Sequence, residues 1–125
     1  IKKMVKDLNM NLKIEICPIV REKDGLAMST RNIYLDAENR KSALSLSEAL
    51  FEAEKMIKAG EKSKQRISEL ISKRIKKESI AQIDYIEIKN CDTLDDIETI
   101  SGKVLIALAM KFSSTRLIDN IVVEV

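Results

Sequence analysis

One apolar segment near the end of the chain limits the possible folds more than any other feature. Residues 104–110, VLIALAM, carry no polar side chain. Such a short apolar run is typical of a central strand that is covered on both faces. The segments 82–89 and 115–125 on either side of it are also rich in β-branched residues. We therefore expect three strands joined by short links.

Two segments that precede these strands have the spacing of helices. After Asp36, a good N-cap, apolar residues recur at three- and four-residue steps until Gly60 provides a stop, at Ala43, Leu46, Leu50, Ala53 and Ile57. A second helix follows, with Ile67, Leu70, Ile71 and Ile75 on one face. Helices followed by strands with short links predict an α+β fold, in which two helices pack on a small three-stranded antiparallel sheet.

The first twenty residues have a different pattern. Residues 1–8 have helical spacing, and Asn9 suits a left-handed exit from a helix. Residues 13–20 resemble a strand that finishes near Pro18, because proline cannot donate to a sheet ladder. A helix followed by a strand is the closing unit of an α/β sheet, whose ligands bind after the strand ends. The chain therefore divides near Val20, and because it starts inside a helical pattern we expect a piece of a longer protein.

The composition argues against several classes of function. The 22 basic and 20 acidic residues nearly balance, whereas a nucleic-acid-binding domain usually has a basic excess. There is no histidine, so we expect no transition-metal site. Cys17 and Cys91 lie far apart in apolar surroundings, which favours buried free thiols over a disulfide. No apolar run approaches about 18 residues, so we expect no membrane span and a cytoplasmic protein.

The second helix has a strongly basic outer face, made of Lys62, Lys64, Arg66, Lys73, Arg74, Lys76 and Lys77. We favour a solvated face over a nucleic-acid surface, because no aromatic side chains lie among the charges to stack on bases. Glu61, Glu69 and Glu78 also dilute the positive charge. A nucleic-acid-binding module, or an assembly domain without catalysis, stays open as the alternative.

The segment 21–35, REKDGLAMSTRNIYL, is the best candidate for chemistry. Gly25 permits a sharp turn. Ser29 and Thr30 provide hydroxyls and neighbouring N–H groups, and Arg31 adds a guanidinium, a combination that suits phosphate. A mobile loop of this kind could close over a nucleotide and stabilise charge on phosphorus. The alternative is that the hydroxyls cap local turns while Arg31 pairs with a surface carboxylate. The spacing is not that of a Walker loop, so from the residues alone we favour this structural alternative.

Three stretches resemble the pantothenate synthetase (pantoate–β-alanine ligase) family. CPIVREKDGLAMSTRNIYL is similar to the family's P-x-V-R-E-x-D-G-L-A, then Met or Leu, then S-S-R-N-x-Y-L. DYIEIKNCDTL is similar to its DYVEIVDPDTL, and TRLIDNI to its TRLIDN. The resemblance covers almost the whole chain in order. It implies that residues 1–20 are the last helix and strand of a Rossmann-like nucleotidyltransferase domain, and that residues 21–125 form the C-terminal lid domain.

The resemblance also implies an activity. Family members use ATP and Mg²⁺ to join pantoate to β-alanine through a pantoyl adenylate, releasing AMP and pyrophosphate, and tend to dimerise through the preceding domain. Carried over to this sequence, the ATP contacts are Val20, Met28, Ser29, Thr30 and Arg31. Of these, Ser29 and Arg31 are expected to stabilise the phosphates and the transition state, and Thr30 replaces the usual serine. The family's histidine element and its pantoate-binding glutamines should precede Ile1, so we expect the fragment alone to be inactive.

Three polar residues in or beside these motifs could also be functional. For Asp119 and Asn120, a carboxylate and an amide within the apolar last strand, we favour a structural turn or a buried hydrogen-bonded pair over catalysis. Asp24 favours a role in shaping the loop over one in binding metal. We expect no metal ligand in this chain, because Mg²⁺ keeps its waters and is held mainly by substrate phosphates.

Overall fold

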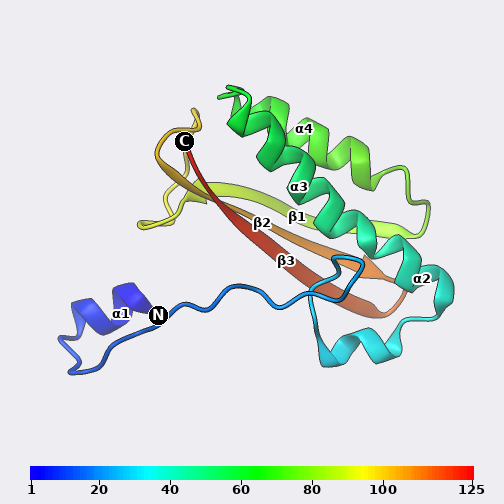
Figure 1. Cartoon of the computed structure of the whole chain (residues 1–125), viewed down its shortest axis with the longest axis horizontal. Coiled ribbons are helices and arrows are strands. Elements are labelled where there is room, and N and C mark those ends of the chain that lie inside the picture. The colour runs from blue at the N-terminus through cyan, green and yellow to red at the C-terminus, as the bar shows by residue number, and fades with distance from the viewer.

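The computed structural model describes residues 1–125 and contains one three-stranded antiparallel sheet in the order β1–β2–β3 (Figure 1). The strands are β1 (Ala81–Asn90), β2 (Lys103–Phe112) and β3 (Thr115–Glu124). The apolar segment 104–110 lies in the central strand, as predicted. Side chains alternate along a strand, and all the side chains on one face of β2 are buried: Val104, Ile106, Leu108, Met110 and Phe112.

Helices cover that buried face. They are α3 (Leu44–Lys58) and α4 (Lys64–Ile75), which pack side by side (Figure 1). Most residues of the predicted periodicity join the strands in one core: Leu46, Leu50, Ala53, Ile57, Ile67, Ile71 and Ile75. Leu70, also predicted, is half-buried, and Ala49 is buried without having been predicted. The α+β prediction is therefore confirmed. The other face of β2 is covered by no helix, so Leu105 and Ala107 stay half-buried, although coverage of both faces was expected.

The helix predicted after Asp36 is divided in two. Asp36 caps α2 (Ala37–Ser42), because its carboxylate accepts a hydrogen bond from the Asn39 N–H at 2.7 Å. The chain then breaks at Ala43 before α3 begins. Gly60 follows α3 with a φ of 105°, as its predicted role as a stop requires.

Residues 1–20 contain α1 (Lys2–Asp7), which lies apart from the sheet (Figure 1). Asn9 leaves the helix with a φ of 48°, as predicted. The strand predicted over residues 13–20 is not formed: the segment is extended, but no other strand of this chain lies beside it to exchange ladder hydrogen bonds. Cys17 is consequently exposed rather than buried, and Cys91 is half-buried; both thiols are free, as expected.

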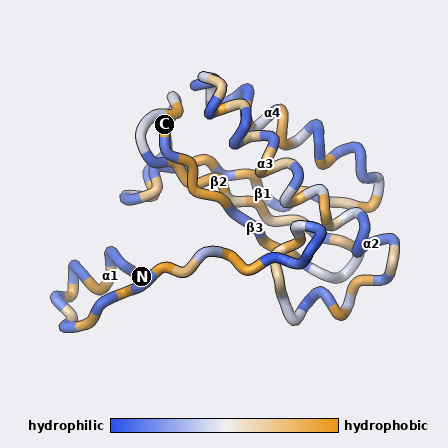
Figure 2. Tube along the Cα trace, in the orientation of Figure 1, coloured by the Kyte–Doolittle hydropathy of each residue, from blue (hydrophilic) through white to orange (hydrophobic).

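The hydropathy pattern follows these layers. Apolar residues run along β2, whereas polar residues dominate the outer side of α4 (Figure 2). None of the helices has the length and apolar character needed to cross a membrane.

Candidate functional site

The candidate loop is a tight turn that backbone hydrogen bonds close at its base. The Met28 N–H donates to the Val20 carbonyl at 2.9 Å, and the Glu22 N–H donates to the Leu26 carbonyl at 2.7 Å. Gly25 lies at the end of the turn with a φ of 97°, a conformation that suits glycine. The turn thus brings Val20 beside Met28, two of the residues expected at the nucleotide.

Asp24 shapes this turn, as predicted. Its carboxylate accepts a hydrogen bond from the Leu26 N–H at 3.4 Å and pairs with the Arg40 guanidinium at 2.9 Å. The hydrogen bond from Arg40 lowers the pKa of the Asp24 carboxyl below its usual value. The Asp24 carboxylate is therefore already neutralised by an ion pair with Arg40.

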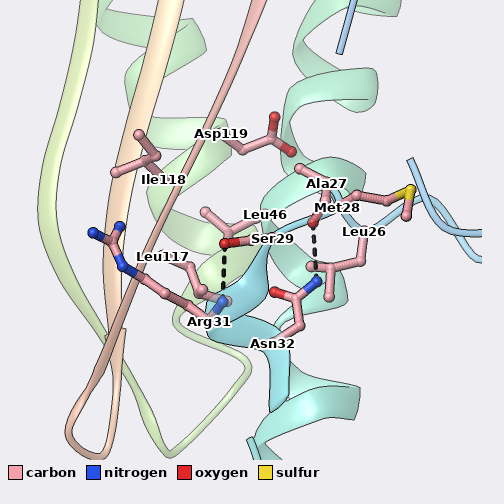
Figure 3. Close-up of a pocket in the computed structure, with 10 residues that line it drawn as sticks. All are labelled: Leu26, Ala27, Met28, Ser29, Arg31, Asn32, Leu46, Leu117, Ile118 and Asp119. Carbon is pink, nitrogen blue, oxygen red and sulfur yellow. Dashed lines mark hydrogen bonds between the residues drawn. The ribbon is translucent and has the colours of Figure 1, made fainter. Parts of the chain in front are cut away.

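The hydroxyl and guanidinium string follows the turn directly. Ser29 is the N-cap of a short 3-10 helix, η1 (Thr30–Tyr34), and its Oγ accepts from the Arg31 N–H at 3.2 Å (Figure 3). The Asn32 amide donates to the Ala27 carbonyl at 3.1 Å and fastens η1 to the turn (Figure 3). The local capping role suggested for these hydroxyls is therefore present for Ser29. An acceptor hydroxyl still has its own proton to donate to a ligand.

The Arg31 guanidinium has no protein partner. It makes no ion pair or side-chain hydrogen bond, so the alternative in which Arg31 pairs with a surface carboxylate is not realised. Met28, Thr30 and Arg31 are all exposed. A guanidinium without a protein partner and the hydroxyls of Ser29 and Thr30, on one short segment, are groups that suit an oxyanion.

A cavity of about 250 Å³ lies beside this string (Figure 3). Leu46 of α3 and Leu117 of β3 contribute to its apolar wall, and Met28, Ser29 and Arg31 also line it. The structure thus brings three of the five expected ATP contacts to one cavity. Val20 and Thr30 do not line the cavity. Val20 accepts a hydrogen bond from the lining residue Met28, and Thr30 lies between the lining residues Ser29 and Arg31.

Sequence reasoning missed the residue that anchors the turn, Arg21. Its guanidinium forms a bidentate pair with Asp119 of β3, with Nη1–Oδ2 at 2.6 Å and Nη2–Oδ1 at 3.0 Å. Nη1 also donates to the Gly25 carbonyl at 3.0 Å, and the guanidinium lies 5.1 Å from the ring centre of Phe51. The hydrogen-bonded role expected for Asp119 is confirmed. Its partner is 98 positions away, so no local signal in the sequence identifies it.

The aspartates around the loop are already occupied by partners of the same chain. Asp24 is paired with Arg40, Asp119 with Arg21, and Asp36 accepts hydrogen bonds from Asn39. No three metal-ligating side chains of the chain gather at one point. The site offers a cation and hydrogen-bond donors that suit an anion.

The chain is similar to one protein family along nearly its whole length. The sequence model of a family described as pantoate-beta-alanine ligase matches residues 1–122. A pantothenate synthetase of Acetivibrio thermocellus is 61% identical over 125 residues, which are 100% of this chain and 44% of that protein. The chain thus spans less than half the length of that relative.

Solved structures agree with the fold. A crystal structure of pantothenate synthetase from Thermus thermophilus matches with a TM-score of 0.89 at 31% identity, over 96% of this chain and 43% of that one. A pantoate-beta-alanine ligase from Francisella tularensis, solved with beta-gamma ATP and beta-alanine, matches with a TM-score of 0.54 at 24% identity. It covers 96% of this chain and 37% of that one, and at this identity it supports the fold alone.

Proposed function

We propose, because this chain belongs to the pantoate-beta-alanine ligase family, that it is the lid part of an enzyme that joins pantoate to β-alanine with ATP. The pantoate carboxylate attacks the α-phosphorus of ATP, which gives pantoyl adenylate and pyrophosphate. The β-alanine amine then attacks the activated carbonyl and releases AMP and pantothenate. The single observation that carries the role of this chain is the unpaired Arg31 guanidinium at the cavity beside Ser29.

Each residue of the loop has a separate task in this proposal. Arg31 stabilises the negative charge that builds on the phosphates as pyrophosphate leaves, because a fixed cation stabilises such charge without reorganisation. Ser29 and Thr30 donate hydrogen bonds to phosphate oxygens. Val20 lies beside the adenine and ribose, and Met28, whose N–H donates to the Val20 carbonyl, is a further contact of ATP. Mg²⁺, where it is used, is carried by the ATP phosphates, in agreement with carboxylates that are already paired.

The remaining parts of the enzyme are proposed from the same family membership. Residues 1–20 close a Rossmann-like domain and residues 21–125 form the lid, with groups of the preceding domain supplying the rest of the site. The exposed apolar side chains of residues 1–20 support this division, because such surface is normally covered. We propose that the full-length enzyme is a cytoplasmic homodimer assembled through that domain.

A nucleic-acid function has no comparable support. Several cations of the basic helix face are already paired with carboxylates of the same chain: Lys64 with Asp96, Arg66 with Glu61, and Arg74 with Glu48. Such internal pairing reduces the positive field available to a polyanion.

The test of this function replaces Arg31 by alanine in a full-length enzyme. A suitable chimera is the Acetivibrio thermocellus relative in which these 125 residues replace the matching segment. Arg31→Ala should slow pantoate-dependent ATP–pyrophosphate exchange by about 100-fold, the loss usual for one transition-state donor. Its free energy of unfolding should change by less than about 0.5 kcal/mol, because the side chain is exposed and unpaired.

Arg66→Ala is the matched control, since Arg66 is also an exposed arginine but lies on α4, away from the cavity. It should leave the exchange rate unchanged. If the Arg31→Ala chimera catalysed the ATP–pyrophosphate exchange as fast as the unsubstituted chimera, Arg31 would have no role in the mechanism. No exchange in the unsubstituted chimera, or pantothenate formation by the 125 residues alone, would contradict the proposed role of the chain as the lid.

A further inference from the structure

The Arg21–Asp119 pair occupies an unusual place in the fold. In the β2–β3 register Asp119 lies opposite Leu108, so it belongs to the buried, helix-covered face of the sheet. Its neighbours on that face are apolar, at Leu117 and Ile121. The Asp119 side chain is 1% exposed and the Arg21 side chain 18%. A carboxylate in such a position requires a partner, because an unpaired buried charge is strongly unfavourable.

The pair does more than neutralise a buried charge. Nη1, one of the two Arg21 atoms that donate to Asp119, also donates to the Gly25 carbonyl at the end of the turn. The backbone of Arg21 pairs with that of Ala27 across the turn. The guanidinium of Arg21 therefore joins β3 to the end of the turn, and its backbone closes the base of the loop at Ala27. Met28 and Ser29 follow directly after Ala27.

A buried ion pair of this kind contributes little to stability compared with apolar packing. Apolar side chains of similar volume often replace a buried ion pair without loss of stability. A planar guanidinium with a bidentate carboxylate, by contrast, fixes distance and orientation. The hydrogen bonds of Arg21 thus fix the position of the loop against β3, which apolar packing would not do as specifically.

We propose that Arg21 and Asp119 are positioning residues that hold the Met28–Arg31 string in register with β3, so that Arg31 meets the phosphates in the productive geometry. This inference deepens the proposed function and rests on it for its catalytic consequence. Asp119 lines the candidate cavity, but its side chain is 1% exposed and paired with Arg21, so this positioning role requires no contact with the substrate.

The decisive variant replaces the pair by an apolar pair, Arg21→Met together with Asp119→Leu. If the pair positions the loop, this double variant should unfold at the same urea concentration as the wild type and yet lose the fixed turn. In the chimera its kcat for adenylate formation should fall by about 100-fold, because a displacement of about 1 Å has such an effect. The KM for ATP should change far less, since the loss is specific to the transition state.

A second readout needs no catalysis. In the 125-residue chain, the amide protons of Glu22 and Met28 close the turn. Their hydrogen exchange should be faster in the double variant than in the wild type, while the exchange of core amides in β2 stays unchanged. If the unsubstituted chimera shows no activity, the proposed function fails, and these two amides still decide whether the pair orders the loop.

Arg21→Lys is the second variant, for the case in which the double variant does not fold. Lysine keeps a positive charge opposite Asp119, but it lacks the planar set of N–H donors that reaches both oxygens of Asp119 and the Gly25 carbonyl. We expect a lowered kcat and faster exchange of the Glu22 and Met28 amides. Wild-type kcat and wild-type amide protection, in either the double variant or Arg21→Lys, would overturn the proposal.

Glu48→Gln is the matched control. It weakens another arginine–carboxylate pair, between Glu48 of α3 and Arg74 of α4, which lies outside the loop and the cavity. It should change neither kcat nor the exchange of the Glu22 and Met28 amides. A comparable fall in kcat in this control would show that the kinetic effect is not specific to the Arg21–Asp119 pair, and would overturn the proposal.

Discussion

Gly25 shows how much of the site depends on single residues. Its φ of 97° lies in the region that L side chains rarely adopt. A Cβ at this position would lie 3.4 Å from Ser47 Oγ, which is ordinary contact, so the main obstacle is the backbone conformation. Gly60 has a similar φ of 105° and no atom within 4 Å of such a Cβ. The two glycines are therefore alike in strain but differ in location.

Gly25→Ala and Gly60→Ala should each lower the free energy of unfolding by about 1–2 kcal/mol, the cost of a left-handed conformation for a residue with a Cβ. Urea denaturation of the 125-residue chain measures both values. Gly25→Ala alone should also speed the hydrogen exchange of the Met28 amide, because Gly25 shapes the turn that this amide closes. An equal effect of Gly60→Ala on Met28 would contradict the local role of Gly25.

At the scale of elements, the central strand has two unequal faces. The side chains of Leu108 and Met110 are fully buried under the helices. On the opposite face no helix covers the sheet, and Ile118 and Val122 of β3 are exposed. Burial of the helix-covered face is consequently the main source of stability for the sheet, since stabilisation scales with the apolar area removed from water.

Leu108→Ala should lower the free energy of unfolding by about 2–5 kcal/mol, through lost burial and the cavity left behind. Val122→Ala, on the uncovered face at 42% exposure, should cost less than about 1 kcal/mol. Urea denaturation of both variants measures the difference. Equal losses would mean that something covers the outer face of the sheet in solution.

At the scale of the whole molecule, Asp96 joins three parts of the chain. It lies in the connector between β1 and β2, and accepts hydrogen bonds from Lys89 of β1 at 2.9 Å and Lys64 of α4 at 3.3 Å. These two hydrogen bonds lower the pKa of the Asp96 carboxyl below its ordinary value of 3.8, and the one from Lys89 has the larger effect. The same contact raises the pKa of Lys89 above 10.5.

A lowered carboxyl pKa in the folded state stabilises the fold above the unfolded value, and that contribution is lost as the pH falls through the folded value. Asp96→Asn should therefore be less stable than the wild type at about pH 7, and the two should converge as the pH falls through the folded-state pKa of Asp96, which lies below 3.8. Urea denaturation across this range tests the prediction. Asp95→Asn is the control, because Asp95 forms no ion pair and its variant should show no such pH-dependent difference.

The sequence by itself determined the local features of this protein. Periodicity indicated the helices and the strands, and the apolar run placed residues 104–110 at the centre of the sheet. These patterns are visible because a helix or a strand is specified by residues that lie a few positions apart. The glycine, the hydroxyls and Arg31 of segment 21–35 were visible for the same reason, but it was the resemblance to a family that favoured phosphate over local capping.

Only the tertiary structure decided what depends on distant partners. It joined Arg21 to Asp119 across 98 positions, and it left Arg31 without a carboxylate. It also left residues 13–20 as an extended segment, because β propensity needs a neighbouring strand before a ladder can form. The reason is common to all three cases: pairing of charges and of strand edges depends on which groups meet in space, and this is set by packing of the core rather than by local spacing.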